Sequence, residues 1–241
     1  MEYLNSVANV KNGLIVSCQF EAGDPFDKPD YVALFALSCQ GGGAAGIRTE
    51  GKENIKAVKA RVALPIIGLI QSAYSDGSTL ITADFKDINE IIEAGADIVA
   101  LDVTERVRPN GLTGFEFLKR VRTSHPGTLL LADVSTFEEG VQAAELGADI
   151  ISTTLSGYTP ATADKNRGGV DFDLVERLAD SLVVPVVAEG RILHPGEAAH
   201  ALELGAYAVV VGAAITKPTV ITQMFVHEIQ SKGNQEEEKK D

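Results

Sequence analysis

Apolar runs recur at regular intervals along the chain and alternate with segments of helical periodicity. The eight runs are LIVSC (14–18), AAGIR (44–48), PIIGLI (65–70), IVALDVT (98–104), LLLADV (129–134), DIISTTL (149–155), VVPVVAE (183–189) and AVVVGAAI (208–215). The segments between them, such as DFKDINEIIEAG and TFEEGVQAAELG, space their apolar residues three and four apart. Runs that are apolar throughout predict strands buried on both faces, so the alternation predicts a parallel sheet covered by helices on both sides.

A short repeat marks the points where a helix is expected to end before the next strand. EAGAD ends at residue 97, ELGAD at 149 and ELGAY at 207, and each leads directly into an apolar run. Glycine in this position is typical of the left-handed residue that terminates a helix. The repeats are 52 and 58 residues apart, which is about two βα units each. We therefore predict an α/β fold, a single (β/α)8 TIM barrel over 1–241 with a frayed acidic tail at about 233–241; an open doubly wound sheet is the alternative.

The composition narrows the classes of partner. The formal net charge is −13 and basic residues are not clustered, which argues against a general nucleic-acid binder. No apolar run approaches about 18 residues, the first residues lack the apolar core of a signal peptide, and there are only 2 cysteines. We expect a cytoplasmic protein with no nucleic-acid or membrane partner. An anionic small molecule is compatible with the charge, because a pocket can be locally positive on an acidic protein.

Several chemistries that need a cofactor or a special nucleophile lack their motifs. GGGAAG at 41–46 fits the dinucleotide pattern GxGxxG, but it follows a helical segment and leads into a strand, so it predicts a helix-ending turn. The four histidines show no metal-ligand spacing, there is no GxSxG elbow, and no predicted strand ends in lysine. We therefore predict neither a cofactor nor a metal.

Polar residues stand at the predicted C-terminal ends of the strands, where the functional groups of such barrels lie. In chain order they are Cys18, Gln19, Arg48, Gln71, Asp102, Thr104, Asp133, Thr153, Thr154, Glu189, Gly190, Arg191 and Gly212. Some polar strand ends are expected in any barrel, since the chain must leave the core somewhere. A ring that combines arginine, three acids and two glutamines indicates a polar small-molecule ligand.

The last two strand ends indicate where a phosphate would bind. AEGR (188–191) and VVGAAITKP (210–218) supply glycines that let backbone N–H groups approach an anion, and Lys217 adds a positive charge. The alternative is that these glycines only permit tight turns. Glu189 precedes the first of them at the end of an apolar strand, which fits acid–base chemistry on a phosphorylated molecule, including proton abstraction beside a carbonyl.

The role of Asp133 is open at this point. The following STFE predicts a capping box between Ser135 and Glu138, so the helix start does not need Asp133. Its carboxylate is then available to bind substrate or to make a structural hydrogen bond.

The role of Asp102 is open as well. It begins DVTERVRP, which contains Arg106 and Arg108. These arginines are able either to pair with Asp102 or to reach a ligand, and the sequence favours neither.

Several motifs are specific enough to suggest a family. They are GLIVSCQ (13–19), GIR (46–48), PIIGLI (65–70), LADVSTFEEG (131–140), STTLSGYT (152–159), VVAEGRI (186–192) and VVGAAIT (210–216). Together they resemble the N-acetylmannosamine-6-phosphate 2-epimerase family from about residue 13 to 218. The resemblance implies an isomerase that interconverts N-acetylmannosamine 6-phosphate and N-acetylglucosamine 6-phosphate in sialic acid and amino sugar catabolism. It also implies a homodimer, with the C-terminal helix at about 218–231 as the expected contact.

The resemblance implies roles for individual positions. Glu189 matches the glutamate of the family's AEG motif, which acts as the acid–base group at C2 of the open-chain sugar through an enolate. Gln19, Arg48 and Asp133 match substrate-contacting positions, to which we add Thr154; Gly190, Gly212 and Lys217 match the phosphate site, to which we add Arg191 and Ala213. Lys217 stands where arginine is common, so the charge is kept and the bidentate fork is lost.

Gln71 departs from the family pattern. The family's third strand normally ends in GI(I/V)K, with a lysine regarded as the partner acid–base group, whereas this chain reads GLIQ. An amide forms hydrogen bonds but does not transfer a proton at a useful pKa. Three interpretations stay open: Glu189 performs both transfers with help from a substrate hydroxyl while Gln71 orients the sugar, turnover is crippled, or a group such as Tyr74 replaces the lysine.

These interpretations leave three functional hypotheses. The first is a C2 epimerase of N-acetylhexosamine 6-phosphates. The second is a catalytically impaired homologue that binds sugar phosphates without proton exchange at C2. The third is another phosphosugar enzyme on the same barrel, such as an isomerase that is indifferent to the N-acetyl group.

Overall fold

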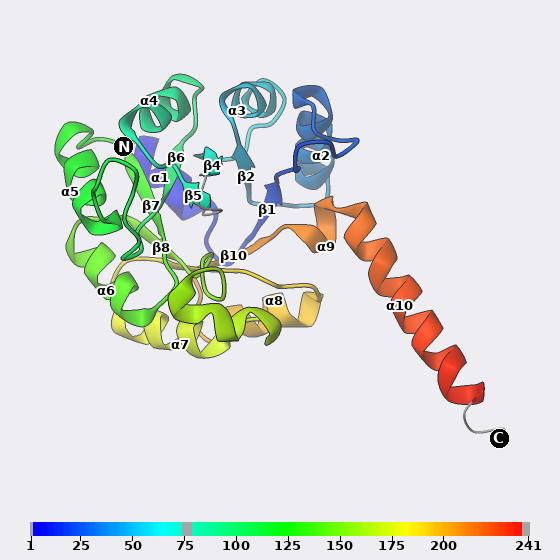
Figure 1. Ribbon diagram of the computed structural model, residues 1–241. Helices are drawn as coiled ribbons and strands as arrows, with labels where there is room; N and C mark the ends of the chain where they lie inside the picture. The colour runs from blue at the N-terminus through cyan, green and yellow to red at the C-terminus, as the bar shows by residue number, and fades with distance from the viewer. Residues whose placement is uncertain (1, 74–78, 238–241) are drawn as a thin grey trace.

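In the computed structural model, which describes residues 2–73 and 79–237, eight parallel strands form a closed barrel (Figure 1). They are β1 (Leu14–Cys18), β2 (Gly46–Glu50), β3 (Ile66–Leu69), β6 (Ile98–Asp102), β7 (Leu129–Asp133), β8 (Ile150–Ser152), β9 (Val186–Glu189) and β10 (Ala208–Val211). The order around the barrel is β1-β10-β9-β8-β7-β6-β3-β2. Each of the eight predicted apolar runs overlaps one of these strands, so the (β/α)8 fold is confirmed.

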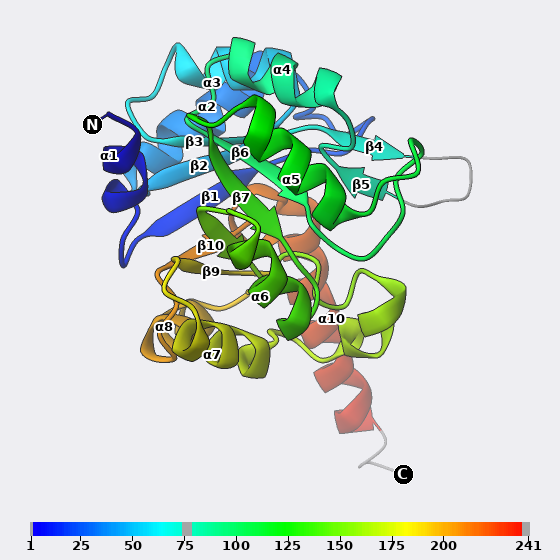
Figure 2. The same cartoon turned by 90° about the vertical axis from the view of Figure 1, so that its left-hand side faces the viewer.

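Helices cover the outside of the barrel and close its N-terminal end. The outer helices are α2 (Pro29–Gly41), α3 (Lys52–Lys59), α4 (Phe85–Glu93), α5 (Gly114–Ser124), α6 (Phe137–Glu145), α7 (Phe172–Ser181) and α8 (Pro195–Glu203). The first helix, α1 (Glu2–Asn9), lies at the end of the barrel where the strands begin (Figure 2). The predicted helix-ending glycines Gly95, Gly147 and Gly205 all have a left-handed φ of 91–97°.

Inward and outward positions alternate along each strand. In β7, Leu129 and Leu131 belong to the interior cluster, whereas Leu130 and Ala132 pack against the outer helices. The inward positions of β7 change from apolar to polar along the strand, because the inward residue after Leu129 and Leu131 is Asp133. Five polar residues follow an interior apolar residue by two positions in this way: Ser17, Asp102, Asp133, Ser152 and Glu189. The polar end of the barrel interior is thus a continuation of its core.

A two-stranded hairpin that the sequence analysis did not predict follows β3. It consists of β4 (Gln71–Ala73) and β5 (Thr79–Ile81), which pair with each other outside the barrel sheet. The prediction that Gln71 ends the third strand is therefore wrong in detail, because β3 stops at Leu69 and Gln71 opens the hairpin. At the base of the hairpin the Thr82 hydroxyl donates to the Ala100 carbonyl oxygen at 2.6 Å. This bond ties the hairpin to β6.

The capping box of α6 lies one residue later than predicted. The helix begins at Phe137, so Thr136 is the N-cap and its hydroxyl accepts from the Glu139 N–H at 3.2 Å, while Glu139 accepts in return from the Thr136 N–H at 3.1 Å. The predicted pair of Ser135 and Glu138 is wrong. Ser135 instead donates its hydroxyl to Glu139 at 2.7 Å.

The chain after β10 leaves the barrel surface. A short α9 (Ala213–Thr216) follows the last strand, and α10 (Pro218–Glu237) then projects away from the barrel (Figure 1). A 3-10 segment, η1 (Pro160–Arg167), lies between β8 and α7. The predicted frayed tail began at about 233, whereas α10 continues to Glu237; residues 238–241 lie outside the described part.

We expect Gly114→Ala to lower the free energy of unfolding by about 2–3 kcal/mol, measured by urea denaturation. A Cβ at Gly114 would lie 2.6 Å from the Thr104 backbone nitrogen and 2.8 Å from the Val103 carbonyl carbon, so the backbone of the loop after β6 would have to move. Gly127→Ala is the control, because a Cβ there meets nothing within 4 Å. Equal stability of the two variants would contradict this packing argument.

Candidate functional site

A cavity of about 520 Å³ opens at the C-terminal end of the barrel. The predicted site residues that line it are Gln19, Gln71, Thr154, Glu189, Gly190, Arg191, Gly212, Ala213 and Lys217. Arg48 and Asp133 are buried in the barrel interior and contact the residues of the cavity wall. Residues as far apart in the chain as Gln19 and Lys217 thus form one site.

Arg48 bridges two carboxylates inside the barrel. Its guanidinium donates to both oxygens of Asp133, at 3.0 and 2.8 Å, and its Nη1 lies 3.2 Å from Glu189 Oε2. The side chains of Arg48 and Asp133 are 1% and 0% exposed. Burial of this kind is tolerated only when charges are paired and hydrogen-bonded, and here two carboxylates share one cation. With both carboxyl groups ionised, the cluster has one surplus negative charge, which one additional proton would neutralise.

Hydroxyl groups from the end of β8 hold Glu189. Thr153 Oγ1 accepts from the Glu189 N–H at 3.0 Å and donates to the Glu189 carbonyl oxygen at 2.9 Å. Thr154 Oγ1 lies 3.1 Å from Glu189 Oε2 and also donates to Asp133 Oδ1. Ser152 Oγ is 2.7 Å from the Thr154 hydroxyl. The carboxyl group of Glu189 is therefore fixed in position while its side chain remains 12% exposed at the cavity.

Burial raises the pKa of Glu189 to about 7, against the lowering effect of Arg48 and with a further raising effect of Asp133. Burial also raises the pKa of Asp133, which the paired Arg48 opposes. Glu189 makes the weaker contact with Arg48 and faces the cavity, so it is the carboxyl group suited to exchange a proton near neutral pH.

The residues predicted for a phosphate lie together at one side of the cavity. Gly190 has a φ of 119° and Gly212 precedes α9, so both are positions where the backbone can come close to a ligand. Lys217 Nζ forms an ion pair with Glu21 Oε1 at 2.6 Å. Arg191 donates to the carbonyl oxygens of Ser156 and Gly169, and its guanidinium lies over the Tyr158 ring.

Two glutamine amides form the wall near the hairpin. Gln71 Nε2 donates to Gln19 Oε1 at 3.3 Å, and Gln19 Nε2 donates to Ser17 Oγ at 2.7 Å. The Gln71 N–H donates to Glu50 Oε1 at 3.2 Å. Gln71 thus reaches the site although it lies outside the barrel sheet.

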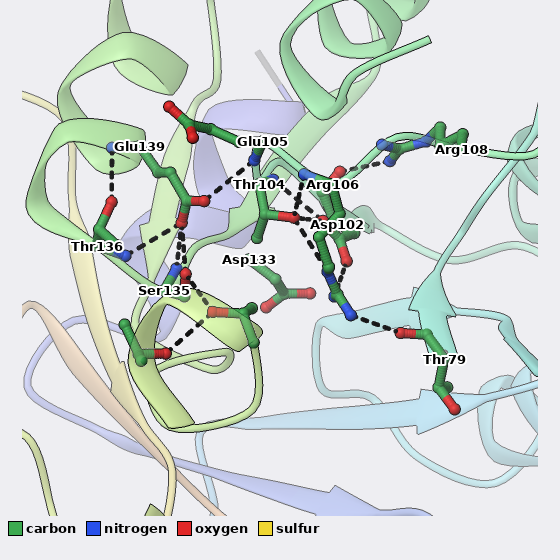
Figure 3. A network of polar contacts seen from close by, with 12 residues as sticks. Thr79, Asp102, Thr104, Glu105, Arg106, Arg108, Asp133, Ser135, Thr136 and Glu139 are labelled. Atoms are coloured by element: carbon green, nitrogen blue, oxygen red, sulfur yellow. Dashed lines mark hydrogen bonds and ion pairs between the residues drawn. The ribbon is translucent and has the colours of Figure 1, made fainter. Parts of the chain in front are cut away.

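Asp102 belongs to a separate network beside the site (Figure 3). Its carboxylate pairs with Arg106 and accepts from the Thr104 N–H and hydroxyl at 3.0 and 2.7 Å, while Arg108 donates to its carbonyl oxygen. Arg106 also donates to the Thr79 carbonyl oxygen of the hairpin at 3.1 Å. Arg106 therefore pairs with the Asp102 carboxylate and Arg108 binds the Asp102 backbone, which answers the question that the sequence left open.

Several residues of the cavity wall were not predicted from the sequence. They are Ser17, Glu21, Tyr158, Ile192, Leu193, Val210 and Thr216, together with Ser152 beneath it. Ser17 and Ser152 could have been found from the period-two pattern, since each follows an interior apolar residue by two positions. Tyr158 and Glu21 carry no such signal, because they lie in loops.

Two further observations concern the described residues, 2–73 and 79–237. Within them, no three His, Cys, Asp or Glu side chains converge as metal ligands would. No helix in these ranges combines the length and the apolar character that crossing a membrane requires.

Comparison with known proteins gives consistent matches. A family model described as "Putative N-acetylmannosamine-6-phosphate epimerase" matches residues 32–231. A "Putative N-acetylmannosamine-6-phosphate 2-epimerase" of Caldanaerobacter subterraneus subsp. tengcongensis is 49% identical over 223 residues, covering 92% of this chain and 93% of the relative. A protein of the same name from Clostridioides difficile is 42% identical over 221 residues, with 92% and 97% covered.

Solved structures agree with these matches. The N-acetylmannosamine-6-phosphate 2-epimerase from Clostridium perfringens superposes with a TM-score of 0.85 at 42% identity, covering 92% of this chain and 95% of that one. A thiamine phosphate pyrophosphorylase from Pyrococcus furiosus, at 16% identity and a TM-score of 0.59, covers 88% and 92% and shares the fold alone.

We expect Glu189→Gln to change how stability depends on pH. The pKa of Glu189 is about 7 in the folded state and near 4.5 ordinarily, so the unmodified chain loses stability as the pH rises from about 4.5 to about 7. The variant lacks this loss, so its free energy of unfolding relative to the unmodified chain should rise by up to about 3 kcal/mol between pH 5 and 8. Urea denaturation at several pH values measures this. Exposed Glu176→Gln is the control; parallel pH curves for all three proteins would contradict the assignment.

Proposed function

Because the chain belongs to the N-acetylmannosamine-6-phosphate epimerase family, we propose that it interconverts N-acetylmannosamine 6-phosphate and N-acetylglucosamine 6-phosphate. The observation that carries the proposal is the Glu189 carboxyl group, which lines the cavity and has a pKa raised to about 7. A group that titrates near neutrality both takes and returns a proton efficiently. Relatives at 49% and 42% identity are named "Putative N-acetylmannosamine-6-phosphate 2-epimerase", which supports the same reaction.

The proposed reaction moves one proton at C2 of the sugar. The C2 proton is acidic only when C1 is an aldehyde, so the open-chain form reacts. Glu189 removes the proton, the electron pair of the C–H bond becomes part of an enolate, and return of a proton to the opposite face inverts C2. Arg48, 3.2 Å from Glu189 Oε2, orients the carboxylate. The step exchanges only a proton, so its chemistry requires no redox or metal cofactor.

The cavity offers separate regions for the two ends of the substrate. We assign the sugar to the side of the cavity at Gln19 and Thr154, next to the buried pair of Arg48 and Asp133, and the phosphate to Gly190, Arg191, Gly212, Ala213 and Lys217. The Lys217 ammonium already pairs with Glu21, so a bound phosphate would share or replace that carboxylate. An ammonium on a flexible stem allows such an exchange, because its donors rotate freely.

Gln71 decides how the second proton transfer is made. Its amide donates to Gln19 and does not transfer protons, so we assign it the role of orienting the sugar. Glu189 then serves both transfers, helped by a hydroxyl of the substrate. The alternative group, Tyr74, lies outside the described residues.

A second candidate function follows from the same glutamine. A chain without the family's lysine is also consistent with a homologue that binds hexosamine 6-phosphates and turns them over very slowly. Loss of one acid–base group typically lowers a rate about 10²–10⁴-fold. The glutamine at position 71 leaves the proposed binding residues Arg48, Asp133 and Lys217 in place.

Proton NMR in D₂O with N-acetylmannosamine 6-phosphate tests the proposal. We expect the unmodified chain to form N-acetylglucosamine 6-phosphate and to incorporate deuterium at C2. Glu189→Gln should lower the exchange rate by about 10²–10⁴-fold, because the acid–base group is removed. Glu203→Gln on the exposed face of α8 should exchange at the unmodified rate.

The same assay separates the other hypotheses. Binding without exchange until Gln71→Lys is made would overturn the epimerase proposal in favour of the impaired homologue. Equal turnover of glucosamine 6-phosphate would instead indicate an enzyme that is indifferent to the N-acetyl group.

We further propose that the reaction belongs to amino sugar catabolism, including sialic acid degradation, in the cytoplasm. The family and the phosphorylated sugar support this placement. Phosphorylated sugars are charged and stay in the compartment where they are made.

We also propose that the protein is a homodimer held by α10. This helix has 20 residues, about 30 Å, and exposes Phe225, Val226 and Ile229, which are 68%, 44% and 70% exposed. Beside α8 lies an apolar groove of about 420 Å³, whose wall includes Leu14, Ala198, Leu202, Val209, Val211 and Ile215. Because α10 projects away from the barrel, it leaves this surface of its own chain uncovered (Figure 1). We propose that α10 of a second copy occupies the groove.

We expect the combined substitutions Phe225→Asp and Ile229→Asp to convert a dimer of twice 25.5 kDa into a monomer, measured by sedimentation velocity. Two charges on the apolar side of the helix oppose its burial. His227→Asp is the control, since His227 is exposed and helical spacing puts it on the other side of α10. A monomeric unmodified chain, or a double variant that stays dimeric, would contradict the proposed interface.

A further inference from the structure

The hydroxyl group of Thr154 lies between the two carboxylates of the site. It contacts three oxygens: Asp133 Oδ1, which is the closest, Ser152 Oγ at 2.7 Å and Glu189 Oε2 at 3.1 Å. Asp133 ends β7, Ser152 and Thr154 lie at the end of β8, and Glu189 ends β9. Asp133 is fully buried. No solvent is needed to complete the set, because a hydroxyl donates once and accepts twice.

The number of protons in this cluster is set by its geometry. Three oxygen–oxygen contacts require three protons, whereas the Thr154 and Ser152 hydroxyls supply only two. Asp133 accepts from Arg48 through both oxygens, at 3.0 and 2.8 Å, so it is the carboxylate that remains ionised. The third proton therefore belongs to Glu189, which donates to Thr154 while Thr154 donates to Asp133.

Loss of the Glu189 proton changes this arrangement. Once Glu189 is ionised, its Oε2 and Asp133 Oδ1 both require the single Thr154 proton. Asp133 keeps its two bonds from Arg48 when that proton leaves, whereas Glu189 has only the 3.2 Å contact with Arg48 and a long, 3.5 Å contact with Ser152. Rotation about the Thr154 Cβ–Oγ bond then directs the hydroxyl proton to Glu189, which has the weaker remaining contacts.

We propose that Thr154 is a positioning residue whose hydroxyl turns from Asp133 to Glu189 when Glu189 gives up its proton, and turns back when the proton returns. The proposal rests on the proposed function for the substrate that receives the proton. No bond to Thr154 itself is broken, since the exchanged proton moves between Glu189 and the sugar while Thr154 only rotates its own hydroxyl.

The charged groups around Glu189 leave this role to Thr154. Arg48 of β2 already pairs with Asp133, and Asp102 of β6, in register with Asp133, is paired with Arg106. Across the cavity, Lys217 pairs with Glu21, and Arg191 stacks on Tyr158 while donating to backbone carbonyls. Thr154 is therefore the nearest neutral donor that can follow the ionisation of Glu189 without changing its own charge.

Thr154→Val and Thr154→Ser test the proposal, because valine keeps the shape and serine keeps the hydroxyl. The carboxylic C=O infrared band of Glu189, assigned by difference from Glu189→Gln, is titrated from pH 5 to 9 in D₂O. The bond from Thr154 lowers the pKa of Glu189, so Thr154→Val should raise its midpoint by about one pH unit. Thr154→Ser should titrate as the unmodified chain does.

Deuterium exchange at C2 provides the kinetic readout. We expect Thr154→Val to lower kcat about 10-fold, to leave KM nearly unchanged and to shift the pH profile upward by the same unit, with rescue in Thr154→Ser. If the valine variant does not fold, Thr154→Ala removes the same hydroxyl. Circular dichroism before each titration confirms that the variants are folded.

Two results would overturn the proposal. Identical midpoints for the unmodified chain and Thr154→Val would mean that the hydroxyl does not follow the Glu189 proton. Equal shifts in the valine and serine variants would mean that only the shape of the side chain matters. The infrared titration needs no turnover, so a chain that shows no exchange with any hexosamine phosphate would refute the proposed function while the role of Thr154 is still decided.

Discussion

The buried guanidinium of Arg48 is the interaction on which the site depends. It extends from β2 to Asp133 on β7 and Glu189 on β9, strands that are not its neighbours in the barrel, and so links three separate parts of the wall. Because Arg48 and Asp133 are nearly inaccessible to water, removing the Arg48 charge would leave a buried carboxylate unpaired, which typically costs about 3–5 kcal/mol. Barrel closure and the placement of Glu189 are therefore coupled.

The charge balance around Arg48 also explains the chemistry that the site can perform. One cation and two carboxylates leave a surplus negative charge in a dry interior, and protonation of one carboxyl group relieves it. Glu189 takes that proton because it faces the cavity, whereas Asp133 is held by both Nη atoms of Arg48. Gln71, on a hairpin outside the barrel, adds a hydrogen-bonding amide and no second proton carrier.

Local patterns predicted the features that depend on local physics. The eight apolar runs and the glycines at 95, 147 and 205 were placed correctly, because strand burial and helix termination leave a period or a special residue in the sequence. The capping box was placed one residue early, because STFE and TFEE both fit the pattern and only the observed start of α6 chooses between them. The hairpin at Gln71 left no comparable signal in its short strands.

The sequence by itself determined the barrel, the strand ends at which the polar residues lie and the family to which its motifs belong. The tertiary structure decided which polar residues pair: Arg106 with Asp102, and Arg48 with Asp133, which is 85 residues away in the chain. It also decided that Thr154 lies between two carboxylates. Such contacts arise only when the barrel closes, because its curvature brings the inward positions of distant strands within a hydrogen bond of one another, and no local pattern records that geometry.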